Sequence, residues 1–427
     1  MIMDKAMIIA VNTGKPANEF NEELSELIKL CEACEIEVLD TLTQNLSRIN
    51  PNTYIGSGKV QEMKLLLESE ECGIVVVNDE LSPLQVSNLE KELGVDVFDR
   101  TYIILEIFSR RARTKEAKLQ VQLASNIYQL PRLVGAHKHL SRQRGTGSGA
   151  LHGRGGGEMK LELDRRLISK QINDIKAELK ELKNLRKTQR KLRKKQGMKV
   201  ASLVGYTNSG KSSTLNALLS YSISKRKEVY EKDMLFATLE TSTRLVKTEN
   251  NLSFLLTDTV GFVNKLPHQL VEAFKSTLEE ISEADLILHI IDSSNQNYEK
   301  QIEVTNRVLK ELNADKIPMI YVFNKIDLLE DGFFIPPLYE KAIKISAKNG
   351  DNLDLLLTMI EDELFQDYRL LYLKLPFSRI DLYSKIKENA IIEEELIEED
   401  GYLLKTKVSD HLYELVHKYH INKDRKN

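Results

Sequence analysis

One eight-residue stretch constrains this chain more than any other feature. It reads GYTNSGKS, has the spacing G-x-x-x-x-G-K-[ST], and lies between the short apolar run 200–204 and a helical pattern that begins at Thr214. A phosphate loop needs this context, because its glycines let backbone N–H groups wrap around a polyphosphate at a helix N-terminus. The residues expected to bind phosphate are Gly205, Tyr206, Thr207, Asn208, Ser209, Gly210, Lys211, Ser212 and Ser213.

Two side chains of this loop have distinct expected roles, and a carboxylate further along completes a magnesium site. Lys211 neutralises the β- and γ-phosphates, and Ser212 offers its hydroxyl to Mg²⁺. Asp258 ends the apolar run 254–257, so it lies at the carboxyl end of a predicted strand, where it can act in the second coordination shell of the metal. Gly261 follows and can direct its backbone N–H at a γ-phosphate.

Two further polar stretches, each after a predicted strand, favour guanine as the base. Asp327 can accept hydrogen bonds from both the N1–H and the exocyclic amine of guanine, a pair of donors that adenine does not offer. The sequence therefore predicts GTP and not ATP. Ala347 can present a backbone N–H to the guanine oxygen. The residues expected at the base are Asn324, Lys325, Asp327, Ser346, Ala347 and Lys348.

Two segments are expected to change conformation with the nucleotide. In the first, 236–244, a threonine must reach Mg²⁺ only when the γ-phosphate is bound, and Thr238 is the first candidate and Thr241 the second. In the second, 261–270, Phe262 stands where many small GTPases have a water-orienting glutamine, so intrinsic hydrolysis should be slow. The switch residues are Phe236, Thr238, Thr241, Asp258, Phe262 and His268. Together these elements predict an enzyme that hydrolyses GTP to GDP and phosphate, with Mg²⁺ as cofactor.

The bulk properties describe a cytoplasmic protein with an uneven charge. The 427 residues are enough for about three domains, and no apolar run approaches the roughly 20 residues that cross a bilayer. Three cysteines and no export signal favour the cytoplasm. The formal charge is −3, but 132–195 holds 19 Lys or Arg against 6 Asp or Glu. A near-neutral total therefore does not argue against a polyanionic partner.

The segment before the phosphate loop divides into two parts. Up to residue 99, short β-rich runs alternate with helical periodicity, which predicts a small parallel sheet covered on both faces. A long helix is then expected at 101–129, ended by Leu130 and Pro131, and a second from residue 158 whose apolar stripe would pack against it. Between them, 135–157 contains 8 glycines and suits contact with phosphate backbones. The candidate RNA-binding residues are Arg142, Arg144, Arg154, Lys187, Arg190 and Lys191.

These patterns give an expected α/β architecture of four parts. It has an N-terminal small parallel α/β domain at 1–100, a long basic helical hairpin at 101–195 with its glycine-rich loop at 135–157, a P-loop GTPase domain at 196–366, and a small C-terminal α+β domain at 367–427.

Several long stretches resemble the HflX GTPase family, and the resemblance covers essentially the whole chain. The matching stretches are 110–124 (RRARTKEAKLQVQLA), 128–133 (YQLPRL), 140–143 (LSRQ), 161–166 (LELDRR), 205–208 (GYTN), 237–239 (ATL), 258–262 (DTVGF) and 266–268 (LPH). The resemblance implies an N-terminal domain unique to the family, a helical hairpin, a GTPase domain and a small C-terminal domain. It also implies binding to the large ribosomal subunit and its rRNA, and GTP-dependent splitting or rescue of stalled ribosomes.

The missing glutamine raises the question of what assists hydrolysis. Asn208 resembles the K⁺ ligand of potassium-activated GTPases, and a bound K⁺ would do the electrostatic work of an arginine finger. A second, compatible hypothesis is that the ribosome orders the switches in trans.

Other functions share part of these features. The main alternative is a GTP-timed ribosome assembly or RNA-binding factor without splitting activity. A membrane-associated GTPase, recruited weakly and peripherally through the basic run 183–195, is another alternative. Asp327 argues against a general helicase or transport enzyme.

Overall fold

The computed structural model describes residues 4–421, apart from 144–153, 196, 223–241, 251, 266–269, 271–272, 275–277 and 330–331. The described residues form two compact units. One contains the described residues up to Asn184 together with those of Val263–Ser276, and the other contains the described residues from Leu185 to Phe262 and from Thr277 onward. The chain therefore passes from the second unit back to the first between Phe262 and Val263. None of the helices in the described part of the chain has the length and apolar character that a membrane crossing needs.

The first unit begins with the predicted parallel sheet. Its strands and helices alternate in the order β1 (Asp4–Asn12), α1 (Ala17–Ala33), β2 (Ile36–Asn45), α2 (Ser57–Ser69), β3 (Ile74–Val77), α3 (Pro83–Leu93) and β4 (Asp96–Asp99). The strands are parallel, in the order β2-β1-β3-β4. The central strand β1 is buried from Ala6 to Val11, as an apolar run covered on both faces should be. The prediction of an N-terminal parallel α/β sheet is confirmed.

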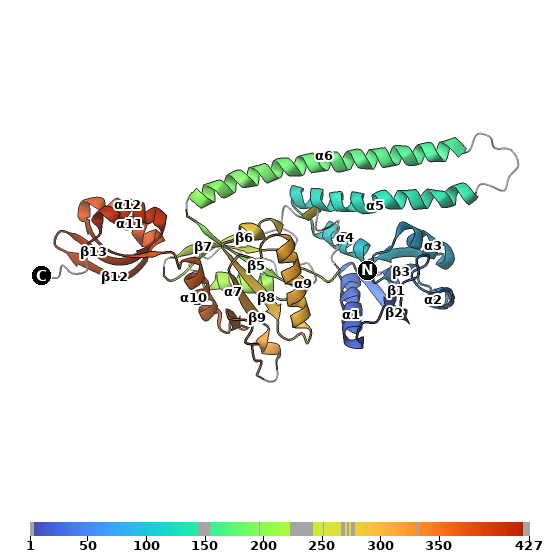
Figure 1. Cartoon of the computed structure of the whole chain (residues 1–427), viewed down its shortest axis with the longest axis horizontal. Coiled ribbons are helices and arrows are strands. Elements are labelled where there is room, and N and C mark those ends of the chain that lie inside the picture. The colour runs from blue at the N-terminus through green and yellow to red at the C-terminus, as the bar shows by residue number, and fades with distance from the viewer. Residues whose placement is uncertain are drawn as a thin grey trace. The chain divides into compact units, whose positions relative to one another are not determined.

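Three helices follow, and two details of the prediction were wrong. The pattern expected to be one helix at 101–129 is two, α4 (Arg100–Arg111) and α5 (Lys115–Gln143), and α5 continues through Pro131. The partner helix α6 (Arg154–Lys195) begins before residue 158, so part of the segment expected to be a glycine-rich loop is helical. Figure 1 shows α5 and α6 side by side. A proline removes one hydrogen bond and crowds the preceding turn, but it does not end a helix that side-chain contacts hold.

The buried carboxyl group of Asp99 supplies these contacts at the start of α4. It accepts hydrogen bonds from the backbone N–H of Leu81 and Tyr102, from the Tyr128 hydroxyl and from the Arg132 guanidinium. Burial raises the pKa of Asp99, and these donors and the Arg132 charge act in the opposite direction, toward the carboxylate. The Arg132 guanidinium also lies 3.4 Å from the Tyr128 ring centroid. One carboxyl group thus joins the sheet, α4 and the part of α5 that contains Pro131.

The second unit contains a six-stranded sheet in the order β10-β9-β8-β5-β7-β6. Its elements are β5 (Lys199–Gly205), α7 (Lys211–Ser220), β6 (Ser242–Lys247), β7 (Ser253–Asp258), β8 (Leu286–Asp292), α9 (Tyr298–Glu311), β9 (Met319–Asn324), β10 (Ala342–Lys344) and α10 (Leu353–Leu364). All neighbouring strands are parallel except β6, which pairs antiparallel with β7 at the edge. The alternation of strands and helices places the carboxyl ends of β5, β7, β8 and β9 along one edge.

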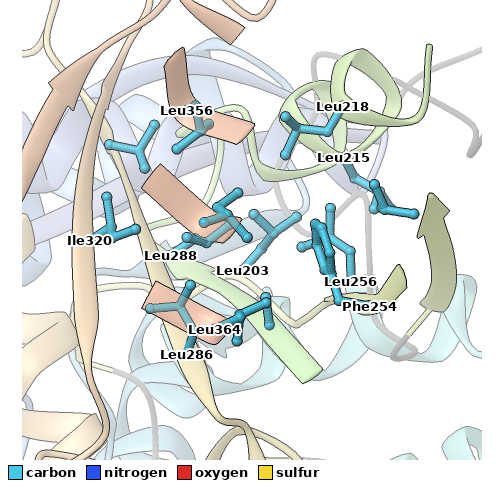
Figure 2. Close-up of a cluster of buried hydrophobic side chains, with 14 of the residues drawn as sticks. Leu203, Leu215, Leu218, Phe254, Leu256, Leu286, Leu288, Ile320, Leu356 and Leu364 are labelled. Carbon is cyan, nitrogen blue, oxygen red and sulfur yellow. The ribbon is translucent and has the colours of Figure 1, made fainter. Parts of the chain in front are cut away.

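Apolar side chains from one face of this sheet form its core. Figure 2 shows Leu203 and Leu288 of the sheet with Leu215 and Leu218 of α7 and Leu356 of α10. These side chains are fully buried, so they fix α7 and α10 against the strands that precede the site.

A small antiparallel sheet forms the C-terminal part of the second unit. Its strands β11 (Arg369–Pro376), β12 (Ile391–Glu398) and β13 (Gly401–Val408) lie in the order β11-β13-β12, and its helices are α11 (Ile380–Asn389) and α12 (Asp410–Val416). Leu373 and Leu404 of the sheet pack with Ile386 and Val416 of the helices. This is the α+β arrangement that the sequence predicted.

Replacing Asp99 tests the contacts that hold the first unit together. Asp99→Ala removes the cap of α4 and leaves Arg132 without its buried carboxylate, so we expect a loss of about 3 kcal/mol or more in local stability. Hydrogen exchange of the α4 amides, followed by mass spectrometry, should then be faster by about a hundredfold. The matched control is Asp96→Ala, an exposed aspartate on the same strand. Equal exchange in the two variants would contradict the role given to Asp99.

Candidate nucleotide-binding site

The predicted phosphate loop lies between β5 and α7, as its motif requires. Gly205, Asn208 and Gly210 have φ values of 149°, 60° and 93°. A Cβ on Gly205 would lie 2.2 Å from the Ile290 carbonyl oxygen, and one on Gly210 would lie 2.1 Å from Nδ2 of Asn324. Glycine is therefore needed at both positions by backbone conformation and by close contact.

The Lys211 ammonium is held against the backbone of this loop. Its Nζ donates to the carbonyl oxygens of Gly205 at 3.1 Å and Tyr206 at 2.7 Å. Burial lowers the pKa of Lys211 to about 8, although the Asp258 carboxylate raises it and Lys325 lowers it further. The ammonium is thus fixed at the first turn of α7, where a bound polyphosphate would restore its ordinary pKa.

Ser212 and Asp258 bring a hydroxyl and a carboxylate together beside the loop. The Ser212 Oγ donates to Asp258 Oδ2 at 2.8 Å, and Asp258 is fully buried at the end of β7. A hydroxyl and a carboxylate are donors that Mg²⁺ prefers, so the residues present fit the metal. Their proposed roles are Ser212 as a direct ligand and Asp258 in the second coordination shell.

The chain that follows Asp258 is fixed to the phosphate loop by its backbone. The Phe262 N–H donates to the Gly205 oxygen at 3.1 Å, and the Thr207 N–H donates to the Phe262 oxygen at 2.7 Å. A Cβ on Gly261 would lie 3.0 Å from the Lys211 Nζ. Gly261 is therefore close to the ammonium expected to bind the β- and γ-phosphates. The Phe262 side chain is 1% exposed and has no polar group that could orient an attacking water.

The residues expected at the base meet around the side chain of Asn324. Its Nδ2 donates to the Ser209 oxygen at 3.0 Å, and its Oδ1 accepts from the Ala347 N–H at 3.0 Å. The Ser346 Oγ donates to Asp327 Oδ1 at 2.6 Å. Lys348 follows on the surface. The structure thus brings the two predicted guanine stretches to the phosphate loop.

Sequence reasoning missed two members of this cluster. The Lys325 Nζ lies 2.7 Å from Asp292 Oδ2, and the Ser293 N–H donates to the Asn324 oxygen at 3.0 Å. Asp292 is the last residue of the buried strand β8 and Ser293 follows it, and the carboxyl end of β8 lies at the same edge of the sheet. Polar residues at the end of an apolar strand were the signal that could have identified them.

Several predicted residues cannot be placed at this site. Phe236, Thr238, Thr241, His268 and Arg144 lie outside the described residues. Of the other candidate RNA-binding residues, Lys187 and Lys191 are exposed on α6. The remaining three belong to described helices, but their side chains are outside the described part: Arg142 on α5, and Arg154 and Arg190 on α6.

Three regions of the chain match models of protein families. Residues 200–325 match a family described as 50S ribosome-binding GTPase, residues 21–109 a GTP-binding GTPase N-terminal region, and residues 111–193 a GTP-binding GTPase middle region. With the loop and base contacts above, these matches define a P-loop GTPase, an enzyme that binds and hydrolyses GTP.

The chain is also similar over nearly its full length to proteins called GTPase HflX. It is 43% identical to that of Caldanaerobacter subterraneus subsp. tengcongensis, covering 98% of this chain and 94% of the relative. It is 41% identical to that of Lacrimispora saccharolytica, over 96% of this chain and 95% of the relative. It is 38% identical to that of Escherichia coli, over 89% of this chain and 88% of the relative. The chain belongs to the HflX GTPase family.

The role proposed for Asp327 can be tested by changing the base. In Asp327→Asn the side-chain amide can donate to the 2-carbonyl of xanthine but cannot accept both guanine donors, so GTP affinity should fall about a hundredfold and XTP affinity should rise. Nucleotide titrations measure both. Asp354→Asn, an exposed aspartate on α10, is the matched control and should leave both affinities unchanged. If the Asp327→Asn protein still preferred GTP to XTP, the proposed contact between Asp327 and guanine would be wrong.

Proposed function

We propose that this chain is a GTP-hydrolysing factor that binds the large ribosomal subunit and its rRNA and splits or rescues stalled ribosomes in the cytoplasm. The observation that carries the proposal is the long, strongly basic helix α6, which leads directly into β5 and the phosphate loop. The family match described as 50S ribosome-binding GTPase supports the choice of the ribosome as the polyanion.

The helices α5 and α6 pair as an antiparallel hairpin in the first unit. Lys115 lies 2.9 Å from Glu178, and Asn126 lies 3.5 Å from Gln171, so later residues of one helix meet earlier residues of the other. Ile175 and Leu179 of α6 are buried. Such a hairpin is a stiff support for cationic side chains, and phosphate contacts from it would fix its register on RNA without reading sequence.

The residues of the nucleotide site suggest how GTP would control this support. Lys211 and Ser212 would hold the phosphates and the metal, and Gly261 would contact the γ-phosphate only before hydrolysis. Mg²⁺, when bound, would neutralise charge on the β- and γ-phosphates. Loss of the γ-phosphate would release Gly261 and the segment after it, which is how hydrolysis would end the interaction with RNA.

A monovalent cation at Asn208 is the proposed aid to hydrolysis. Phe262 cannot orient water, so the charge that assists hydrolysis would come from a K⁺ bound at Asn208. Turnover should therefore be higher in KCl than in NaCl by about tenfold or more. Asn208→Gly removes the side chain but keeps a residue suited to the φ of 60°, and it should abolish this difference. Phosphate release measures the rates, and GDP affinity serves as the control for loop integrity. Equal turnover in the two salts, unchanged by Asn208→Gly, would refute the cation hypothesis.

Sedimentation of intact ribosomes tests the proposed function. With GTP or a non-hydrolysable analogue the protein should raise the proportion of free subunits in a sucrose gradient, and with GDP it should not. Lys187→Glu with Lys191→Glu reverses two exposed charges and should weaken this effect. The slope of log binding constant against log salt concentration should become shallower by about two, one for each lost phosphate contact. Lys64→Glu with Lys91→Glu, exposed on α2 and α3, is the control. Binding to large subunits without splitting would favour the assembly-factor alternative.

A further inference from the structure

The hydroxyl of Thr207 is buried in the phosphate loop. Thr207 is 7% exposed, and within the described part of the chain its Oγ1 has no hydrogen-bond partner. A buried hydroxyl without a partner costs stability, and most buried hydroxyls in proteins are hydrogen-bonded. In a loop built to hold a polyphosphate, a buried hydroxyl that the described residues leave unsatisfied is suited to a bond with the ligand.

The Thr207 side chain is held in place by its own backbone and by its shape. The Thr207 N–H donates to the Phe262 oxygen at 2.7 Å, and the preceding Tyr206 forms a parallel bridge with Phe262. Because threonine is branched at Cβ, rotation about its χ1 is restricted. The hydroxyl therefore has few positions available and would lose little freedom on binding a ligand.

Thr207 and Lys211 border one small space beside Gly261, and all three belong to the second unit. A Cβ on Gly261 would lie 2.9 Å from the Thr207 Cγ2 and 3.0 Å from the Lys211 Nζ. The same point is thus in contact with the Thr207 side chain and with the ammonium expected to bind the β- and γ-phosphates. The Thr207 hydroxyl is attached to the same carbon as this methyl group, so it lies within reach of the expected γ-phosphate.

Hydrolysis of GTP needs hydrogen-bond donors at this position. In phosphoryl transfer the negative charge is spread over the three equatorial oxygens of the transferred group, and catalysis is mainly positioning and electrostatic stabilisation. The neighbouring Phe262 side chain has no polar atom to contribute. A threonine hydroxyl can donate one hydrogen bond, and a bond to a phosphate oxygen is charge-assisted and stronger than one between neutral groups.

We propose that Thr207 is a catalytic residue whose hydroxyl donates to an oxygen of the γ-phosphate, more strongly in the transition state than in bound GTP. Water forms the new bond to the γ-phosphorus and loses a proton to phosphate, the bond to the β–γ bridging oxygen breaks, and GDP leaves. Thr207 keeps its own proton throughout. The inference rests on the hydrolysis of GTP and on the proposed place of the γ-phosphate beside Lys211 and Gly261, and not on ribosome binding.

Two substitutions separate the hydroxyl from the rest of the side chain. Thr207→Val replaces it with a methyl group of similar size, and turnover at saturating GTP should fall by about tenfold or more. Thr207→Ser keeps the hydroxyl and should remain within about threefold of the unchanged protein. Phosphate release by the full chain without ribosomes measures these rates. KM for GTP and affinity for GDP should change by less than about threefold, because the bond is made chiefly in the transition state and GDP has no γ-phosphate.

Thr305 of α9 provides a matched control. It is 0% exposed, it belongs to the same unit, and its Oγ1 is likewise without a partner among the described residues. Thr207→Val and Thr305→Val each remove a buried hydroxyl of this kind, so neither should lower the thermal unfolding temperature of the nucleotide-free protein. Only Thr207→Val should lose turnover. An equal loss of turnover in Thr305→Val would overturn the proposal.

A comparison of salts separates Thr207 from the cation site proposed at Asn208. Thr207→Val should lower turnover in KCl and in NaCl by the same factor, which leaves their ratio unchanged. Unchanged turnover in Thr207→Val, a loss confined to KM, an equal loss in Thr207→Ser, or a changed ratio between the two salts would each contradict the role given to the hydroxyl. None of these outcomes bears on ribosome splitting, which sedimentation tests separately.

Discussion

The nucleotide site depends on one buried amide. Asn324 is 2% exposed and uses both ends of its side chain, donating to the Ser209 oxygen and accepting from the Ala347 N–H. The phosphate loop and the loop after β10 are therefore joined through the end of β9. An unsatisfied buried amide would be costly, so the three loops are stable mainly in the arrangement that completes its hydrogen bonds. The close approach of this amide also explains why Gly210 can carry no Cβ.

Most of this site could be predicted from the sequence, because its chemistry is local. Each polar motif follows a short apolar strand, and parallel strands bring their carboxyl ends to one edge. The positions of Asp258 and Asn324 at the ends of β7 and β9 follow from that rule, and the position of Lys211 follows from the spacing of the phosphate-loop motif. The antiparallel pairing of β6 with β7 was missed because 236–244 was interpreted as a switch and no strand was expected there. The connection 248–252 is too short for a parallel crossover, so the pairing direction follows once β6 is known.

The incorrect helix prediction has a tertiary cause. Local propensity places a break at Pro131, and α5 continues because Arg132 is bound to Asp99, to the Leu81 carbonyl oxygen and to the Tyr128 ring. Likewise, Lys265 donates to Asp79 across a separation of 186 residues, and Asn264 donates to Glu23 across 241. Periodicity reports which face of an element is buried but not which distant charge it meets. Contacts of this kind had to come from the structure.

Phe262 shows how the fold separates two tasks that one segment performs in many GTPases. Its ring is buried and its backbone is bonded to the phosphate loop on both sides, so this residue contributes structure and no water-orienting group. The electrostatic help that hydrolysis needs must then come from elsewhere around the γ-phosphate. Asn208 is exposed, and its left-handed backbone directs the loop around it, which leaves its amide accessible to a cation. A charge supplied from outside the chain would make the hydrolysis rate depend on conditions and partners more than on the chain alone.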